Sequence, residues 1–280
     1  MSGRMNLAGR TAVITGAGSG IGRAAAVSLA QRGCHLALSD INESGLLETV
    51  HLVRAPGLRV SSHLIDVSDR AQVAAFPALV LAEHPGVDVL INNAGVALGG
   101  HFSEVSDEDF EWLFSINFWG VLRMTRAFMP LLQASSDARL VNISSIYGIV
   151  APAGQAAYSA SKFAVRGFSE ALRHELEGTT VGVTVVHPGG VATSIADNAR
   201  IPAGADPVEV ERRRAVQNKL LRMPPARAGE IIVRGIERRK KRVLVGMDAE
   251  AVSLLARIAP VSYWAVLSQR VSEWRGAAPK

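Results

Sequence analysis

Short apolar runs alternate with amphipathic segments along most of the chain, and these runs have the length of β-strands. Three of them contain nearly unbroken apolar stretches, TAVIT, VDVLINN and VGVTVV. Such stretches are typical of strands that are covered on both faces, as in a parallel sheet. Seven strands are predicted in all: Arg10–Thr15, Cys34–Asp40, Arg59–Asp66, Asp88–Ala94, Ala138–Ser145, Val181–His187 and Arg242–Gly246.

Helical patterns lie between these runs, for example over Gly20–Arg32 and Tyr158–Glu177. Alternation of strand and helix implies right-handed crossover connections and a doubly wound α/β sheet. The sequence contains no internal repeat, no low-complexity linker and no visible boundary between two domains. We therefore predict one α/β domain over residues 1–280, with helices on both faces of its sheet.

Two segments depart from this alternation. Residues 193–225 follow the sixth strand with several prolines and the charged stretch VEVERRR, which indicates a substrate lid. Residues 248–275 predict a C-terminal helix, whose packing on the core or on a partner subunit is the favoured interpretation. Contact with a membrane surface is the alternative, favoured if Trp264 and Leu267 are exposed. The apolar positions of this helix are Leu254, Leu255, Ile258, Trp264 and Leu267.

The composition is that of an ordinary globular protein, with 48% hydrophobic and 20% charged residues in a chain of 280. A single cysteine, Cys34, excludes an intrachain disulfide and a cysteine-based metal site. The polar start Met1–Asn6 lacks a signal-peptide pattern, and no apolar run reaches the roughly 18–20 residues of a membrane span. We therefore expect a cytoplasmic protein. No metal is expected either, since metal-ligand spacing is absent among His35, His63, His101, His174 and His187.

The net charge of +5 has a local origin. Between Val208 and Arg242 the chain carries twelve Lys or Arg residues against four Glu. A solvated basic helical surface is the favoured interpretation. Binding to nucleic acid or anionic lipid would need this charge on one face, usually with aromatic or groove-reading elements, and none accompanies it. We therefore predict no nucleic-acid partner and do not expect a peripheral membrane contact.

The sequence AVITGAGSGIGRAAAVSLA joins the first strand to the first helix through a glycine-rich turn. Residues without a Cβ, here Gly16, Gly20 and Gly22, allow the backbone to approach a pyrophosphate closely. The helix that follows offers free N–H groups and a positive dipole end to the phosphates. This position, between the first strand and the first helix, predicts a dinucleotide site.

An acidic residue, Asp40, ends the second strand, 24 residues after Gly16. Its carboxylate can accept hydrogen bonds from the ribose hydroxyls of the adenosine, and it would repel a 2′-phosphate. NAD is therefore favoured over NADP, although Arg23 and Asn42 could reach a phosphate if the loop bends. The alternative is that Asp40 caps the next helix. Asp66, which ends the predicted third strand, could bind the adenine amino group.

Candidate catalytic groups follow in YSASK, which places Tyr158 and Lys162 four residues apart on one face of a helix. Ser145 lies thirteen residues before Tyr158, at the end of the predicted fifth strand. Asn117 lies in SINFWG, within the preceding long helical pattern.

With these elements the sequence resembles the short-chain dehydrogenase/reductase family. The resemblance rests on TGAGSGIG, NNAG at 92–95, Asn117, Ser145, YSASK and HPGGVAT, in the family's order over residues 11–193. It implies a Rossmann-type seven-stranded parallel sheet, a support role for NNAG, and a catalytic tetrad of Asn117, Ser145, Tyr158 and Lys162. The cofactor-binding residues it implies are Gly16, Ser19, Gly20, Ile21, Gly22, Asp40, Asp66, Val67, Asn93, Ala94, Gly95, Tyr158, Lys162, Pro188, Gly189, Val191 and Thr193.

The chemistry of these side chains can also be argued directly. A free tyrosine has a pKa of about 10, too high for a base near neutrality. A neighbouring ammonium such as that of Lys162 would lower this pKa, so that Tyr158 could take or return the alcohol proton. Ser145 could hold the substrate oxygen while charge develops there. Lys162 could bond the nicotinamide ribose, and Asn117 could hold a water that leads protons to solvent.

The predicted function is therefore NAD-dependent hydride transfer between an alcohol and a carbonyl. The alternatives are a nucleotide sensor or scaffold of the same fold, and a membrane-associated lipid or retinoid dehydrogenase. The predicted helical stretches Phe110–Leu132 and Ala156–Glu177 carry apolar residues on more than one face, which predicts a homodimer or homotetramer. The expected small-molecule substrate is apolar. It would meet Ser145, Tyr147, Gln155 and Tyr158, with Ile146 and Val150 near them.

Overall fold

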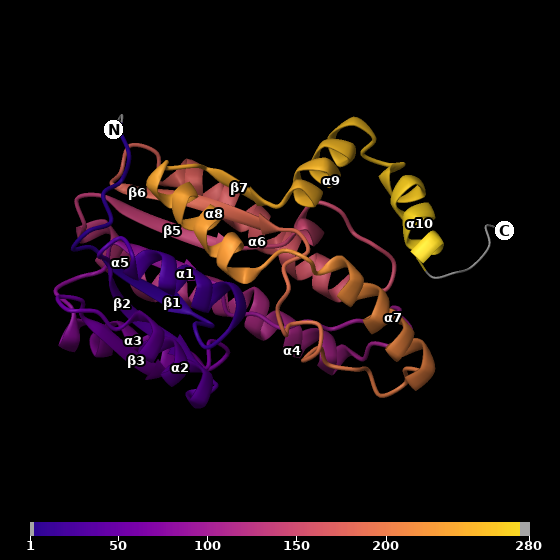
Figure 1. Cartoon of the computed structure of the whole chain (residues 1–280), viewed down its shortest axis with the longest axis horizontal. Helices are drawn as coiled ribbons and strands as arrows, with labels where there is room; N and C mark the ends of the chain where they lie inside the picture. The colour runs from indigo at the N-terminus through magenta and orange to yellow at the C-terminus, as the bar shows by residue number, and fades with distance from the viewer. Residues whose placement is uncertain (1–2, 275–280) are drawn as a thin grey trace.

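Seven parallel strands form one sheet in the order β3-β2-β1-β4-β5-β6-β7, as the sequence predicts. The computed structural model (Figure 1) describes residues 3–274, with the side chains of residues 3–268. The order reverses between β1 and β4, where a doubly wound sheet opens a crevice at the carboxyl ends of its strands. The strands are β1 Thr11–Thr15, β2 His35–Asp40, β3 Val60–Leu64, β4 Val89–Asn92, β5 Ala138–Ile143, β6 Val181–Pro188 and β7 Arg242–Val245.

Three strands end two residues earlier than predicted, namely β3, β4 and β5. The residues that follow leave the sheet because their polar groups bond elsewhere. The backbone N–H groups of Asn93 and Ala94, for instance, both donate to Thr15 Oγ1 at 3.0 Å. The hydrophobic pattern does not record where a strand gives way to such a loop.

Helices cover both faces of the sheet (Figure 1), which confirms the doubly wound arrangement. Along β1, Ala12 and Ile14 join the core beneath α1, α2 and α8, whereas Val13 joins the core beneath α3 and α5. The helices are α1 Gly20–Ala30, α2 Glu43–Val53, α3 Arg70–Glu83, α4 Asp107–Asn117, α5 Trp119–Ala134, α6 Ala156–Glu175, α7 Pro207–Leu220, α8 Pro225–Glu237, α9 Met247–Ile258 and α10 Tyr263–Trp274, with a short 3₁₀ turn η1 Ile146–Gly148.

The long helical pattern Phe110–Leu132 is two helices, so its prediction as one stretch is wrong. Phe118, with φ −117° and ψ −56°, is the C-cap of α4 and the N-cap of α5, so the first helix ends and the second begins there. At the end of α4, Asn117 bonds both backbone groups of Val96, its Oδ1 accepting at 2.9 Å and its Nδ2 donating at 3.0 Å. This tertiary contact fixes Asn117 at a helix end beside the loop after β4.

The predicted single C-terminal helix is also divided, because α9 ends at Ile258 before Pro260 and α10 begins at Tyr263. Residue 275 lies outside the described part of the chain. The Tyr263 hydroxyl accepts a hydrogen bond from the Ala151 N–H at 3.0 Å, which ties α10 to the loop after η1. Trp264 and Leu267 are half-buried rather than exposed.

The segment 193–225 contains α7 and is attached to the body by two ion pairs. Arg213 bonds Glu104 at 2.9 Å, and Arg200 meets Asp109 at 3.1 Å. The Arg200 guanidinium also lies over the Trp112 ring, 4.6 Å from its centroid. Among the residues described, no helix combines the length and the apolar character that crossing a bilayer requires.

Candidate active site

The turn after β1 has a backbone shape that side chains would prevent. Gly16 and Gly20 have φ values of +64° and +52°, in the left-handed region that glycine favours. A Cβ on Gly22 would lie 2.0 Å from the Gly16 carbonyl oxygen. A Cβ on Gly16 would lie 2.8 Å from Ala94 Cα in the loop after β4. Glycine is therefore required at this turn by both backbone angle and space.

Asn93 and Thr15 lock this turn to the loop after β4. The Asn93 amide donates to the carbonyl oxygens of Thr15 at 3.0 Å and Gly16 at 2.9 Å. In return, Thr15 Oγ1 accepts the N–H groups of Asn93 and Ala94. Below this contact, Asn92 donates to Asn142 Oδ1 at 2.9 Å between β4 and β5. The arrangement agrees with the supporting role that the sequence gives to NNAG.

The start of α1 is open towards the crevice. Its N-cap, Ser19, makes no side-chain capping hydrogen bond, so the first N–H groups of α1 are left for another acceptor. Across the turn stands Thr193, whose methyl carbon would lie 3.0 Å from a Cβ on Gly20. Ile21 is partly buried and packs against the core. A narrow glycine cradle with free N–H groups fits the pyrophosphate of a dinucleotide.

Asp40 lies beside this cradle rather than at the start of the next helix. Its carboxylate accepts from the N–H groups of Gly18 at 2.7 Å and Asn42 at 2.9 Å. The N-cap of α2 is Asn42, whose Oδ1 accepts from the Gly45 N–H at 3.0 Å. The alternative that Asp40 caps α2 is therefore wrong.

Arg23 is held by hydrogen bonds to α2 and to the glycine turn. Its guanidinium donates to Thr49 Oγ1 at 3.0 Å, to the Gly45 carbonyl at 3.0 Å and to Glu48 at 2.8 Å. A further short hydrogen bond reaches the Gly18 carbonyl. To meet a 2′-phosphate, Arg23 would have to give up these bonds.

Asp66 and Val67 follow β3 at the same edge of the sheet. Asp66 Oδ1 accepts from the N–H of Ser68 at 2.8 Å and from its hydroxyl at 2.7 Å, which shapes the turn before α3. Val67 is buried, and its side chain meets the backbone of Gly120 on α5. Both predicted residues therefore lie in the loops at the carboxyl ends of the strands.

The second predicted loop, residues 188–193, follows β6. The Gly189 N–H donates to the Val245 carbonyl at 2.9 Å, and the Ala192 N–H donates to the Met223 carbonyl at 2.8 Å. Asp248, on the first turn of α9, accepts from the Gly190 N–H at 2.6 Å. The sequence analysis did not single out Asp248, because only the fold brings α9 to this loop.

The structure brings the predicted tetrad together between β4, β5 and α6. Lys162 Nζ donates to the Ile143 carbonyl at 3.2 Å and lies 5.7 Å from the centroid of the Tyr158 ring. A Cβ on Gly95 would lie 3.4 Å from Lys162 Nζ and 3.0 Å from Asn117 Oδ1. The missing side chain at Gly95 therefore lets the loop after β4 pass directly beside the lysine and the asparagine.

Burial controls the ionisation of the two central residues. It raises the pKa of Tyr158 to about 12, although a hydrogen bond with Ser145 acts in the opposite direction. It lowers the pKa of Lys162 to about 8. The expectation that Lys162 lowers the tyrosine pKa is therefore wrong for the protein alone. The Lys162 ammonium faces the ring and bonds a backbone carbonyl, so it does not offset the loss of water around the phenol.

Ser145 follows β5, and both its hydroxyl and its carbonyl accept hydrogen bonds from neighbouring residues. Its hydroxyl accepts from the Tyr147 N–H at 3.1 Å. Its carbonyl accepts from His187 Nδ1 at 2.9 Å. Beside it, Ser144 Oγ donates to the Lys162 carbonyl at 2.8 Å, which joins β5 to α6.

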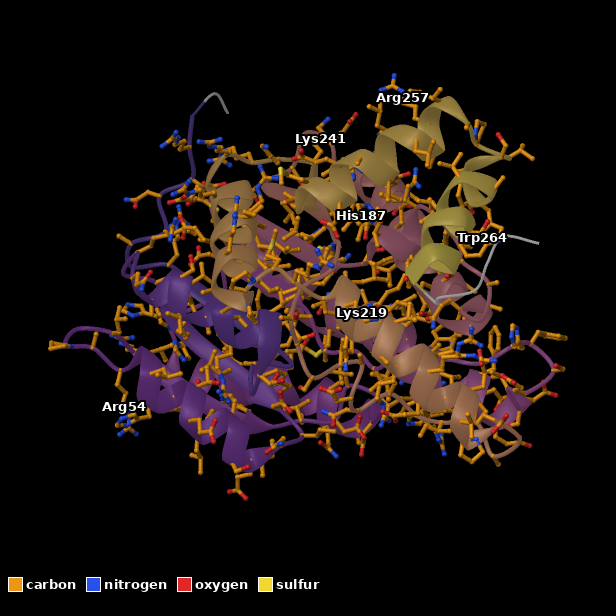
Figure 2. All side chains as sticks on the ribbon, turned by 45° about the vertical axis from the view of Figure 1, so that its right-hand side comes forward. Arg54, His187, Lys219, Lys241, Arg257 and Trp264 are labelled. Atoms are coloured by element: carbon orange, nitrogen blue, oxygen red, sulfur yellow. The ribbon has the colours of Figure 1, made fainter. Side chains whose placement is uncertain are left out.

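His187 is a residue whose position the sequence analysis failed to interpret. It lies fully buried at the end of β6 (Figure 2). Burial lowers the pKa of His187 to about 4, so the ring is neutral near pH 7. Since the Ser145 carbonyl can only accept, Nδ1 carries the proton. His187 is thus a positioning residue for the backbone of Ser145.

The predicted substrate residues surround the tyrosine. The rings of Tyr147 and Tyr158 stand edge to face, with their centroids 6.2 Å apart. Gln155 immediately precedes α6 and pairs with Gly100 in the loop after β4. Val150 is buried and Ile146 is half-buried. Within the part of the chain that is described, no group of three His, Cys, Asp or Glu side chains is placed to hold a metal.

Comparison with known proteins identifies relatives that agree with the family resemblance of the sequence. A family profile described as short chain dehydrogenase matches residues 10–203. SadH of Mycobacterium tuberculosis, which is named as an oxidoreductase, is 43% identical over 272 residues, or 95% of this chain and 96% of SadH. The 3-oxoacyl-(acyl-carrier-protein) reductase FabG of Thermotoga maritima is 31% identical over 71% of this chain and 85% of its own. A crystal structure of a short-chain dehydrogenase/reductase from Burkholderia phymatum in complex with NAD has a TM-score of 0.84 at 33% identity, covering 91% of this chain and 95% of that one.

The burial of His187 predicts a pH dependence of stability. An unfolded histidine titrates near 6.5, whereas the folded ring titrates near pH 4. Between these values the unfolded chain binds a proton that the folded chain does not, so lowering the pH favours unfolding. His187→Asn is the control, because its amide can still donate to Ser145 but does not titrate. The free energy of unfolding of the wild type, minus that of this variant, should fall as the pH is lowered from 6.5 to 4. Denaturant titration at a series of pH values measures this difference, and a difference that stays constant would contradict the assignment.

Proposed function

Because the chain belongs to the short-chain dehydrogenase/reductase family, we propose that it is an NAD-dependent enzyme that moves a hydride between the nicotinamide and an alcohol or carbonyl substrate. This proposal rests on one observation: the glycine turn and the catalytic side chains lie on opposite sides of the same loop, the one that contains Gly95. On one side of the loop after β4 lies the glycine turn, and on the other lie Lys162 and Asn117. A dinucleotide that extends from the turn along this loop would bring its nicotinamide beside Tyr158.

The proton chemistry follows from the burial of Tyr158 and Lys162. With a pKa of about 8, Lys162 is mostly an ammonium at pH 7 and can bond a ribose hydroxyl. Tyr158, with a pKa of about 12, holds its proton in the protein alone and is ready to donate it to a carbonyl oxygen. When bound, oxidised NAD would supply the hydride acceptor, and its positive charge would favour the phenolate of Tyr158. Ser145 then holds the substrate oxygen while Tyr158 takes the alcohol proton.

The substrate class follows from the surroundings of the tyrosine. Tyr147, Val150 and Ile146 supply ring and aliphatic surface, and Gln155 adds one polar amide. These side chains favour an apolar alcohol, aldehyde or ketone. We propose residues 193–225 as the lid over this substrate, attached by the ion pairs of Arg200 and Arg213. A cytoplasmic location is also proposed, since Cys34 is free and buried.

Replacing Tyr158 by phenylalanine tests the assignment of the acid–base group. The change keeps the ring and removes the hydroxyl, so kcat should fall by about 100-fold or more, the usual contribution of such a group. The absorbance of the nicotinamide measures turnover with a panel of alcohols and ketones. NADH affinity serves as the control and should change little. Retention of most of the activity would show that another group transfers the proton.

The carboxylate of Asp40 predicts cofactor preference. With NAD it can accept charge-assisted hydrogen bonds worth about 1.5–3 kcal/mol each, whereas it would repel the phosphate of NADP. We expect kcat/KM to be roughly 100-fold higher with NAD, since 1.4 kcal/mol corresponds to about tenfold. Asp40→Ala should reduce this ratio mainly by weakening NAD. Equal values for the two cofactors in the wild type would contradict the proposal.

An exposed aromatic surface predicts self-association. Trp119 on α5 is 46% exposed and Phe163 on α6 is 38% exposed, although both are large apolar side chains. A twofold axis would let the same surface of a second chain cover them. We expect at least a homodimer by light scattering at micromolar concentration, and a shift to monomer in Phe163→Asp. A monomeric wild type at that concentration would refute this assembly.

A further inference from the structure

A cleft outside the catalytic site is lined by thirteen of the described residues, of which five are cations and one is acidic. It has a volume of about 500 Å³ and lies between α8, β7 and the first turn of α9. Only one acidic residue, Glu250, lines it, among the described residues. The lining cations come from two sources, with α8 and its C-terminal end supplying three and the β7 segment two. They are Arg227, Arg234, Arg238, Lys240 and Arg242.

Most of this positive charge is not neutralised within the described part of the chain. Arg234 pairs with Glu230 at 2.6 Å. Arg242 donates to Ser253 Oγ at 3.0 Å. No acidic group of residues 3–268 lies within 4 Å of the other three cations, which are all exposed. The basic stretch of the sequence therefore places five cations at one cleft, an arrangement that the sequence pattern did not predict.

The contrast with α7 shows that this concentration is local. There Arg212, Arg213 and Arg214 each lie within 4 Å of a glutamate on the same helix. Lys241 and Arg239, next to the cleft residues in sequence, also meet acidic partners, Glu177 and Asp137.

An exposed apolar ridge continues from the cleft along α9. Met247 lines the cleft and is 82% exposed. Leu254 and Ile258 follow on the same helix face, at spacings of seven and eleven residues, and are 58% and 74% exposed. Val261, just beyond α9, is 91% exposed. We call these four residues the ridge. In Figure 1, α9 and α10 stand out from the body of the molecule beyond β7, so the ridge is open to a large partner.

We propose that the cleft and the ridge together dock the protein on the surface of an anionic lipid bilayer. The cations would meet the acidic headgroups, and the ridge would enter the boundary with the acyl chains, which is the combination that holds peripheral proteins at membranes. Neither of two other partners explains the cleft and the ridge together. A second copy across the cleft would place cations against cations, and a nucleic acid would leave the ridge in water.

Flotation with lipid vesicles tests this proposal on the full chain. Vesicles of phosphatidylcholine with 30% phosphatidylglycerol should carry the protein upward at 0.1 M NaCl, whereas pure phosphatidylcholine should carry at least tenfold less. Raising the salt to 0.5 M should release most of the protein, because headgroup attraction is screened. Equal binding to neutral and anionic vesicles, or no binding to either, would overturn the proposal.

Two double variants separate the cleft from the ridge, and each has a matched control. Arg238→Glu with Lys240→Glu should lower the partition coefficient onto anionic vesicles at least tenfold. The control, Arg54→Glu with Arg59→Glu, makes the same charge change at another surface and should leave this coefficient within twofold. Figure 2 shows Arg54 and Arg257 of α9 at opposite ends of the view. Leu254→Ser with Ile258→Ser should also lower it tenfold, whereas Leu79→Ser with Leu81→Ser, exposed residues of α3, should not.

Each variant is first checked for an unchanged thermal transition and unchanged NADH affinity, so that loss of vesicle binding cannot reflect unfolding. Equal losses in the test and control variants would overturn the proposal. So would a change of oligomeric mass in the ridge variant without vesicles, which would assign the ridge to a second copy. Binding to a short DNA duplex that depends on Arg238 and Lys240, without vesicle binding, would assign the cleft to nucleic acid.

Discussion

The close approach of two backbone segments, at Gly16 and Ala94, is the constraint on which the site depends. A Cβ on Gly16 would lie 2.8 Å from Ala94 Cα, and four hydrogen bonds cross the contact, from Asn93 and Ala94 to Thr15 and Gly16. This crossing joins the ends of β1 and β4, where the strand order of the sheet reverses. It aims the start of α1 into the crevice, and it sets the loop after β4 between the glycine turn and Lys162. The loop after β4 thereby connects the glycine turn, on the cofactor side, with Lys162, on the catalytic side.

Close packing fixes the shape of the glycine turn, and burial sets the ionisation of the catalytic side chains. Tyr158 and Lys162 lose water together, and their pKa values move towards neutral forms, to about 12 and about 8. In the protein alone, Tyr158 therefore keeps its proton and is an acid rather than a base. Ser144 and His187 bond the backbone of Lys162 and Ser145 and so keep these two residues in position. Ser144 and His187 are thus positioning residues rather than catalytic ones. The rigid part of the site is polar and buried, while the substrate would meet ring and aliphatic surface.

The sequence predicted what depends on local pattern and missed what depends on tertiary contact. Apolar runs predicted all seven strands, and the spacing of Tyr158 and Lys162 predicted their common helix face. The break at Phe118 was missed because the apolar pattern continues through it, and the contact with Val96 appears only in the fold. A lone histidine at a strand end gave no indication of its bond to Ser145. The cationic cleft was missed for the same reason, since α8 and β7 lie side by side only after folding.

The central claim is that the glycine turn binds a nicotinamide dinucleotide so that its nicotinamide lies beside the tetrad. Titration with NADH, followed by the fluorescence of the nicotinamide, tests it most directly. The account predicts saturable binding of one NADH for each chain. It also predicts loss of that binding in Gly16→Val, because a side chain there meets both Ala94 and the Asn93 amide. Circular dichroism confirms that the variant is folded. A wild type that fails to bind NADH at millimolar concentration, or a folded Gly16→Val with unchanged affinity, would contradict the account.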